Sequence, residues 1–134
     1  GWMVDELMDM LRTHPERGAR LEWLDDASDE YLEEVYRAST AMVLASRGEG
    51  FGLPLVEAAQ RGRSIIARDL PVFREVAAGH AHYFAGDESI SGALETWLQL
   101  HARGEHPRAQ GMQWLSWEQS AARLRRILQE LQET

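Results

Sequence analysis

The amino-acid sequence predicts an α/β fold, in which a parallel sheet of about four short strands carries helices on both faces. Apolar residues at strand-like and helix-like spacing alternate along the chain, as in parallel sheets with crossover helices. The segment 41–45 reads Ala-Met-Val-Leu-Ala, a continuous apolar run typical of a strand buried on both faces. A glycine-rich turn follows this strand, in the place where such sheets bind ligands.

The first third of the chain predicts a helix, a strand and a second helix. Residues 2–13 have apolar side chains at helical spacing, and Pro15 ends this helix because proline disfavours helical geometry in the residue before it. Residues 20–24 are expected to form a short strand, and Ser28 is a good N-cap for a helix over 29–38. The apolar side chains expected to be buried on the two helices are Val4, Leu7, Met8, Leu11, Leu32, Val35 and Tyr36.

The remainder of the chain predicts two further strands and four helices. Gly62 is expected to end the helix that begins at Pro54, because glycine readily adopts the left-handed conformation found at helix ends. Ser116 is a second good N-cap, and the last helix is expected to run from it toward Gln132. The other predicted elements are strands over 64–67 and 81–84 and helices over 72–78 and 90–102.

Composition fits one globular domain and excludes several classes of protein. The chain has 134 residues and a net charge of −8, which argues against nucleic-acid binding. It has no cysteine, so disulfides and thiolate metal sites are excluded. Because we find no apolar run that would span a membrane and no signal peptide, we expect a cytoplasmic location, with the inner face of the membrane as the alternative. The chain starts at Gly1 rather than at methionine, and we interpret it as a piece of a longer protein.

The turn after the 41–45 strand has the features of an anion site. Three glycines allow a tight turn and close approach of a ligand to the backbone, and Pro54 suits the first turn of a helix. The amides of Phe51, Gly52 and Leu53 should therefore lack helical partners and point outward, where the helix dipole also favours negative charge. Phosphate is the most natural ligand for such a site.

Two carboxylates flank this predicted anion site. Glu49 lies in the turn, and Glu57 lies about one turn inside the helix that follows. Carboxylates repel phosphate but accept hydrogen bonds from hydroxyl groups, so Glu49 suits a sugar and Glu57 a ribose. The pattern predicts a site for a sugar joined to a nucleoside through a diphosphate. The residues alone also allow a plain tight turn, with Glu49 solvated and Glu57 stabilising the start of the helix.

The turn 46–57 resembles the Glu-Gly-Phe-Gly-Leu-Pro turn of retaining GT-B glycosyltransferases of family four. The similarity extends to the segments 28–39 and 65–76 and to Ser116-Trp117-Glu118, so it covers nearly the whole chain. It implies a Rossmann-like fold, and residues 1–134 would form an incomplete C-terminal, donor-binding lobe. The closest similarity is to enzymes of bacterial O-antigen or capsule assembly.

The resemblance also implies the substrates and the site residues. The donor would be a UDP- or GDP-linked sugar, and a glycan or lipid-linked acceptor would bind the other lobe. No cofactor or metal would be required. Glu49 would take the catalytic position at the donor sugar. The implied donor-binding residues are Glu49, Gly50, Phe51, Gly52, Leu53 and Glu57.

The chain departs from the family pattern at its amino-terminal side. A complete lobe opens with two more strands, and an arginine and a lysine in the first turn neutralise the diphosphate, but no segment here matches them. We therefore expect no glycosyl transfer by the isolated chain. The two absent strands would leave an empty place in the sheet, which either the 20–24 strand or a strand of a second chain would fill. Because faces that are normally buried become exposed, we also expect self-association.

Two other functional interpretations remain open from the sequence. The first is a non-catalytic α/β module that associates with itself and binds no nucleotide, and the second is a related epimerase or phosphorylase. Nearby residues have simple structural explanations. We expect Arg68 to pair with Asp69 or Glu75, and we expect no metal at His80 and His82, which have no carboxylate cluster beside them.

Overall fold

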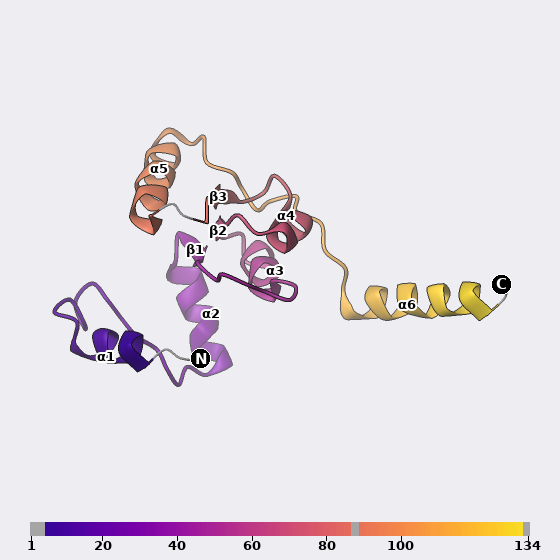
Figure 1. Cartoon of the computed structure of the whole chain (residues 1–134), viewed down its shortest axis with the longest axis horizontal. Helices are drawn as coiled ribbons and strands as arrows, with labels where there is room; N and C mark the ends of the chain where they lie inside the picture. The colour runs from indigo at the N-terminus through magenta and orange to yellow at the C-terminus, as the bar shows by residue number, and fades with distance from the viewer. Residues whose placement is uncertain (1–4, 87–88, 133–134) are drawn as a thin grey trace. The chain divides into compact units, whose positions relative to one another are not determined.

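The computed structural model describes residues 5–86 and 89–132, which divide into two compact units between Val35 and Tyr36 (Figure 1). Helix α2 passes through the division. The elements in chain order are α1 (Asp5–Thr13), α2 (Asp29–Ala38), β1 (Ala41–Leu44), α3 (Leu53–Gln60), β2 (Ser64–Arg68), α4 (Pro71–Ala77), β3 (His82–Phe84), α5 (Ile90–Arg103) and α6 (Trp117–Gln132).

The first unit contains a turn where the sequence suggested a strand. The amides of Ala19, Arg20 and Leu21 all donate to the carbonyl of Glu16, at 3.1, 2.9 and 3.0 Å. The described part of this unit has a single isolated bridge, from Arg17 to Leu21, and no strand over 20–24. The predicted strand was wrong because these backbone groups find hydrogen-bond partners locally, in the turn, and not in a sheet.

The apolar side of α1 is more exposed than its spacing suggested. Leu7 is 46% exposed, and the helix buries no described residue. The prediction of a buried stripe was wrong for Leu7, and it was also wrong for Leu32 on α2, which is 40% exposed. Amphipathic spacing shows which side of a helix is apolar, but burial requires another element to cover that side. Val4 lies outside the described residues.

The second unit contains a three-stranded parallel sheet in the order β1-β2-β3. Ala41 pairs with Ser64 at one end of the first ladder, and Ile66 pairs with His82 at the start of the second. This confirms the α/β class and three of the four expected strands. The three-stranded sheet of the described residues does not include 20–24, and its completion by a second chain stays a prediction.

Helices cover both faces of the sheet, as the sequence predicted. Ile65 and Ala67 of β2 face one way and pack with α3 and α4 in a core that contains Leu55 and Phe73. Ile66, the residue between them, faces the other way and packs with Phe84 of β3 and with Ala93 and Trp97 of α5. The two separate cores explain why β2 reads as a continuous apolar run rather than an alternating one.

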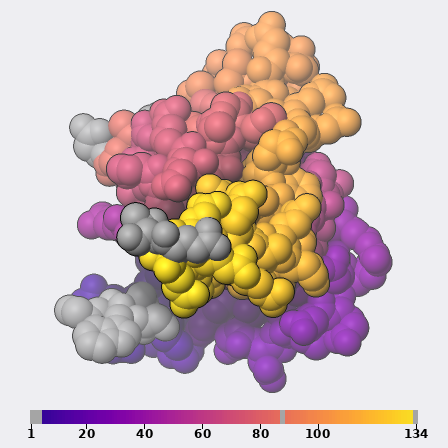
Figure 2. Space-filling model, turned by 90° about the vertical axis from the view of Figure 1, so that its right-hand side faces the viewer, coloured from indigo at the N-terminus to yellow at the C-terminus, as the bar shows by residue number. Residues whose placement is uncertain are grey.

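Helix α6 begins with the cap that the sequence predicted. The Ser116 hydroxyl accepts a hydrogen bond from the amide of Gln119 at 3.2 Å, and the Gln119 side chain accepts one from the amide of Ser116 at 2.8 Å. This reciprocal arrangement is a capping box. No described residue of α6 is buried, and the helix, yellow in Figure 2, is a surface element. Among the residues that the structure describes, no helix combines the length and apolarity needed to cross a membrane.

Candidate functional site

The glycine-rich turn lies at the carboxyl edge of the sheet. It leaves β1 after Leu44 and enters α3 at Leu53, with Pro54 in the first turn of the helix. The turn itself is exposed at Gly48, Glu49 and Gly50, while Gly52 is buried. The chain therefore places the predicted anion site where ligands of open parallel sheets bind.

Gly52 is required in this turn for two separate reasons. Its φ angle is +90°, a left-handed conformation that residues with a Cβ rarely adopt. A Cβ at this position would also lie 3.0 Å from Phe73 and 3.1 Å from Leu55, two fully buried side chains. The turn can therefore pack closely against the core of α3 and α4 because Gly52 has no side chain.

The amides at the start of α3 have no hydrogen-bond partner among the residues that the structure describes. The first helical hydrogen bond runs from the amide of Leu55 to the carbonyl of Gly52 at 2.9 Å. Within the described residues, the amides of Phe51, Gly52 and Leu53 donate no hydrogen bond, and no side chain caps the helix. These donors, together with the helix dipole, provide what an anion would need.

The two flanking glutamates have different environments. Glu49 is exposed, and no hydrogen bond or ion pair to it occurs among the described residues. Glu57 is half-buried, and its carboxylate accepts a hydrogen bond from the Tyr36 hydroxyl at 3.1 Å. Arg61 lies over the Tyr36 ring, 4.5 Å from its centroid. Glu57 is thus held by an aromatic residue of α2, while Glu49 is open to solvent.

Tyr36 is a site residue that the sequence did not identify. Its position on α2 predicted a buried aromatic residue, which its half-buried ring partly bears out. Its hydroxyl also lies 3.7 Å from the sulfur of Met42 on β1. The sequence signal for this role is weak: a buried tyrosine usually has a polar partner for its hydroxyl, but nothing in the local spacing of residues indicates that this partner is Glu57.

Arg68 does not form the ion pair that was expected from the sequence. Its guanidinium donates to the carbonyls of Ala45 and Gly86, at 3.2 and 2.7 Å, and lies over the Phe84 ring. The predicted pairing with Asp69 or Glu75 was wrong. Arg68 ends β2 between two shorter neighbouring strands, and its side chain bonds to carbonyls that follow both of them. It therefore fastens the carboxyl edge of the sheet beside the candidate site.

Asp69 pairs with Arg74 instead. The guanidinium makes two hydrogen bonds to the carboxylate, both 2.7 Å long, and lies over the Tyr83 ring at 3.9 Å. The hydrogen bond to Arg74 lowers the pKa of Asp69 below its usual range, and burial raises the pKa of Tyr83. These residues fix the loop between β2 and α4, and both charges are already matched.

His80, one of the two histidines near β3, interacts with the loop that follows α5. His80 interacts through Nδ1 with the carbonyl of Arg108 at 3.1 Å, which ties the 104–116 loop to the end of α4. Among the described residues, no group of three or more histidine or acidic side chains is placed to hold a metal ion. His80 thus has a structural role in positioning that loop.

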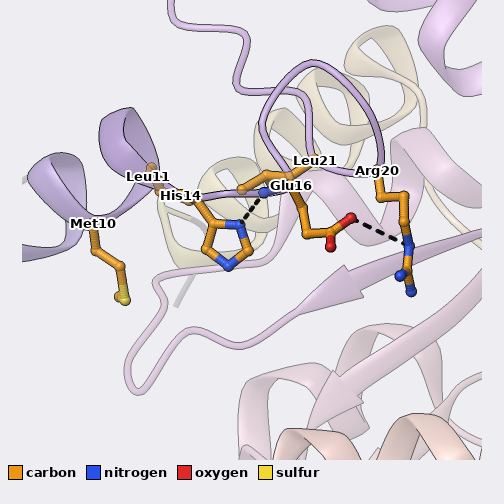
Figure 3. A pocket seen from close by; sticks show the side chains of 6 residues that line it. All are labelled: Met10, Leu11, His14, Glu16, Arg20 and Leu21. Atoms are coloured by element: carbon orange, nitrogen blue, oxygen red, sulfur yellow. Dashed lines mark hydrogen bonds and ion pairs between the residues drawn. The ribbon is translucent and has the colours of Figure 1, made fainter.

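A separate hollow of about 470 Å³ lies in the first unit (Figure 3). His14 accepts a hydrogen bond from the amide of Glu16 at 3.2 Å, and Glu16 pairs with Arg20 at 3.7 Å. Met10, Leu11 and Leu21 complete its lining. Its polar side chains already pair within the hollow, so we assign no binding or catalytic role to it.

An open parallel sheet covered by helices, with a glycine-rich turn at the carboxyl ends of its strands, defines a Rossmann-like α/β domain. The chain matches the family "Glycosyl transferases group 1" over residues 11–113, and it belongs to that family. No solved structure matches the chain.

Relatives of this chain are bacterial mannosyltransferases. It is 50% identical over 123 residues to "Serotype-specific mannosyltransferase WbdA" from Escherichia coli, an alignment that covers 90% of the chain and 15% of the relative. It is 35% identical over 72 residues to "O-antigen chain mannosyltransferase RfbU" from Salmonella typhimurium, covering 54% of the chain and 20% of the relative. The chain thus spans a small part of these enzymes.

Proposed function

We propose that this chain is the donor-binding part of a larger retaining GT-B glycosyltransferase that uses a nucleoside diphosphate sugar. The observation that carries the proposal is the start of α3, where three amides have no hydrogen-bond partner among the described residues and Glu49 and Glu57 flank them in the sequence. The names of the relatives favour mannose as the sugar. The acceptor would be a glycan or a lipid-linked glycan bound by a part of the enzyme outside this chain.

Each group in the turn has a chemical role in this proposal. The amides of Phe51, Gly52 and Leu53 would bind the diphosphate and stabilise the negative charge that develops on it as the glycosidic bond breaks. Glu49, exposed in the turn, would accept hydrogen bonds from the sugar hydroxyls. Glu57 would accept from the ribose hydroxyls, with its carboxylate held in place by the Tyr36 hydroxyl.

Isothermal titration calorimetry with GDP-mannose, GDP, UDP-glucose and UDP tests this proposal on the 134-residue chain. We expect binding with a Kd of about 1 mM or tighter for at least one of these ligands, weakened at least about tenfold by Glu57→Ala. Glu95→Ala, which removes an exposed glutamate side chain from α5, is the control and should leave the affinity unchanged.

If none of the four ligands binds, the result favours the second candidate function, a module that binds no nucleotide and associates with itself. The exposed apolar residues of α6, including Leu124 and Leu131 at 58% and 69% exposure, are the observation behind this candidate. Absence of heat with all four ligands at millimolar concentration would contradict donor binding. Glycosyl transfer itself is tested on the complete enzyme, because no transfer is expected from this chain alone.

A further inference from the structure

A pocket of about 620 Å³ lies at the amino ends of the strands. Its lining comes from the end of α3, the first residue of β2 and the loop that follows α5. Ser64 begins β2, whereas the glycine-rich turn follows the end of β1, and the two strands are parallel. The pocket therefore lies at the opposite edge of the sheet from the proposed donor site.

The loop that forms one wall of this pocket is fixed by packing. Ala109 and Met112 are each 3% exposed and belong to the core beneath α3. The carbonyl of Arg108 is bonded to His80, and His106 packs edge-on against Trp97. A wall held in this way need not be ordered when a ligand binds, which lowers the cost of binding.

The chemistry of the lining fits a hydroxyl-rich ligand. Gln60, Ser64 and Gln110 can each donate and accept hydrogen bonds, as sugar hydroxyls do. Trp114 is 40% exposed and offers an apolar ring surface, as carbohydrate pockets commonly do for the C–H groups of a sugar. None of the lining residues is acidic, although the chain has a net charge of −8.

Charge argues against an anion as the preferred ligand. Burial, with the neighbouring His101 and Arg108, lowers the pKa of His106, which favours its neutral form. Arg108 then supplies the remaining positive charge of the lining, and its side chain is exposed. Gln60 and Gln110 offer acceptors as well as donors, which suits a ligand rich in hydroxyl groups better than a phosphate, which mainly accepts hydrogen bonds.

We propose that this pocket binds a short neutral oligosaccharide, separate from the donor site. The Trp114 ring would stack on one sugar, and Gln60, Ser64 and Gln110 would bind hydroxyl groups. A pocket of this size is within the range of small-molecule sites. The proposal needs no nucleotide at the glycine-rich turn, and only the choice of mannotriose as the first probe rests on the proposed function.

Saturation-transfer NMR with mannotriose, maltotriose and inorganic phosphate tests the proposal on the 134-residue chain. We expect at least one trisaccharide to bind with a millimolar Kd, weakened at least about fivefold by Trp114→Ala and by Gln60→Ala. Trp117→Ala, at a tryptophan that is 80% exposed and outside the pocket, should have no effect. Circular dichroism establishes that each variant is folded, and both pocket substitutions are at exposed positions.

Three results would overturn the proposal. The first is that neither trisaccharide binds at 20 mM, which is about 20 times the Kd expected for a millimolar site. The second is that phosphate alone binds. The third is that Glu57→Ala abolishes trisaccharide binding while Trp114→Ala does not affect it. The last result would place the sugar at the donor turn. Binding that survives Glu57→Ala but not Trp114→Ala supports the pocket, even where nucleotide binding at the turn fails.

Discussion

The hydroxyl of Tyr36 donates a hydrogen bond to the carboxylate of Glu57 across 3.1 Å, joining α2 to α3. The two residues are 21 positions apart, and both are half-buried. The hydrogen bond restrains the carboxylate of Glu57, which lies about one turn inside α3. A carboxylate that is positioned before a ligand arrives loses less freedom on binding, so Tyr36 should contribute to any donor affinity of Glu57.

Tyr36→Phe should weaken nucleotide-sugar binding through Glu57 alone. A net hydrogen bond is worth about 0.5–1.5 kcal/mol, which corresponds to an affinity lower by about two- to tenfold. Calorimetry on Tyr36→Phe, Glu57→Ala and the double variant forms a thermodynamic cycle. The double variant should bind no more weakly than Glu57→Ala, and fully additive losses would show that Tyr36 acts independently of Glu57.

Gly52→Ala should destabilise the chain by about 1–3 kcal/mol, because a Cβ here is both strained at φ +90° and too close to Phe73. Urea unfolding followed by circular dichroism measures the change. Gly48→Ala in the same turn is the matched control, since a Cβ there has no atom within 4 Å, and its effect should stay within about 0.5 kcal/mol. Equal losses in the two variants would contradict this explanation.

Arg68→Ala should loosen the carboxyl edge of the sheet. The substitution removes the hydrogen bonds to the carbonyls of Ala45 and Gly86, and because the guanidinium is partly exposed we expect a loss of about 1–2 kcal/mol. Arg103→Ala, which removes an exposed pair with Glu105, should change stability by less than about 0.5 kcal/mol. Hydrogen exchange at the ends of β1 and β3 should quicken only in Arg68→Ala.

The stability of the chain should fall as the pH drops below neutrality, in part through His106. Burial, His101 and Arg108 lower its folded pKa below the usual 6.5, so the unfolded chain binds the proton more readily. The contribution is fully present above pH 6.5 and is lost as the pH falls through the folded pKa. Thermal unfolding at pH 7.5 and 5.5 should show a smaller drop in Tm for His106→Gln, and an equal drop would contradict the assignment.

Self-association, expected from the sequence, should depend on α6. Trp117, Leu124 and Leu131 are 80%, 58% and 69% exposed, and they recur at a seven-residue interval on one side of the helix. Sedimentation velocity on the wild type should show association that increases with concentration, and Leu124→Gln with Leu131→Gln should reduce it. A wild type that remains monomeric at high concentration would contradict the expectation.

The sequence by itself determined the α/β class, the positions of β1, β2 and β3 and the bounds of most helices. Each of these depends on a pattern within a few residues, such as the continuous apolar run at 41–44 or the capping box at Ser116. The sequence also indicated the exposed amides before Pro54, because glycines followed by proline leave the first amides of a helix without partners.

Only the tertiary structure decided which distant residues meet. It brought Tyr36 to Glu57 and placed Arg68 between the carbonyls of Ala45 and Gly86, and neither contact is visible in local spacing. It also replaced the expected strand over 20–24 with a turn around Glu16. A strand exists only where a neighbour satisfies its backbone hydrogen bonds, and apolar alternation cannot supply that neighbour.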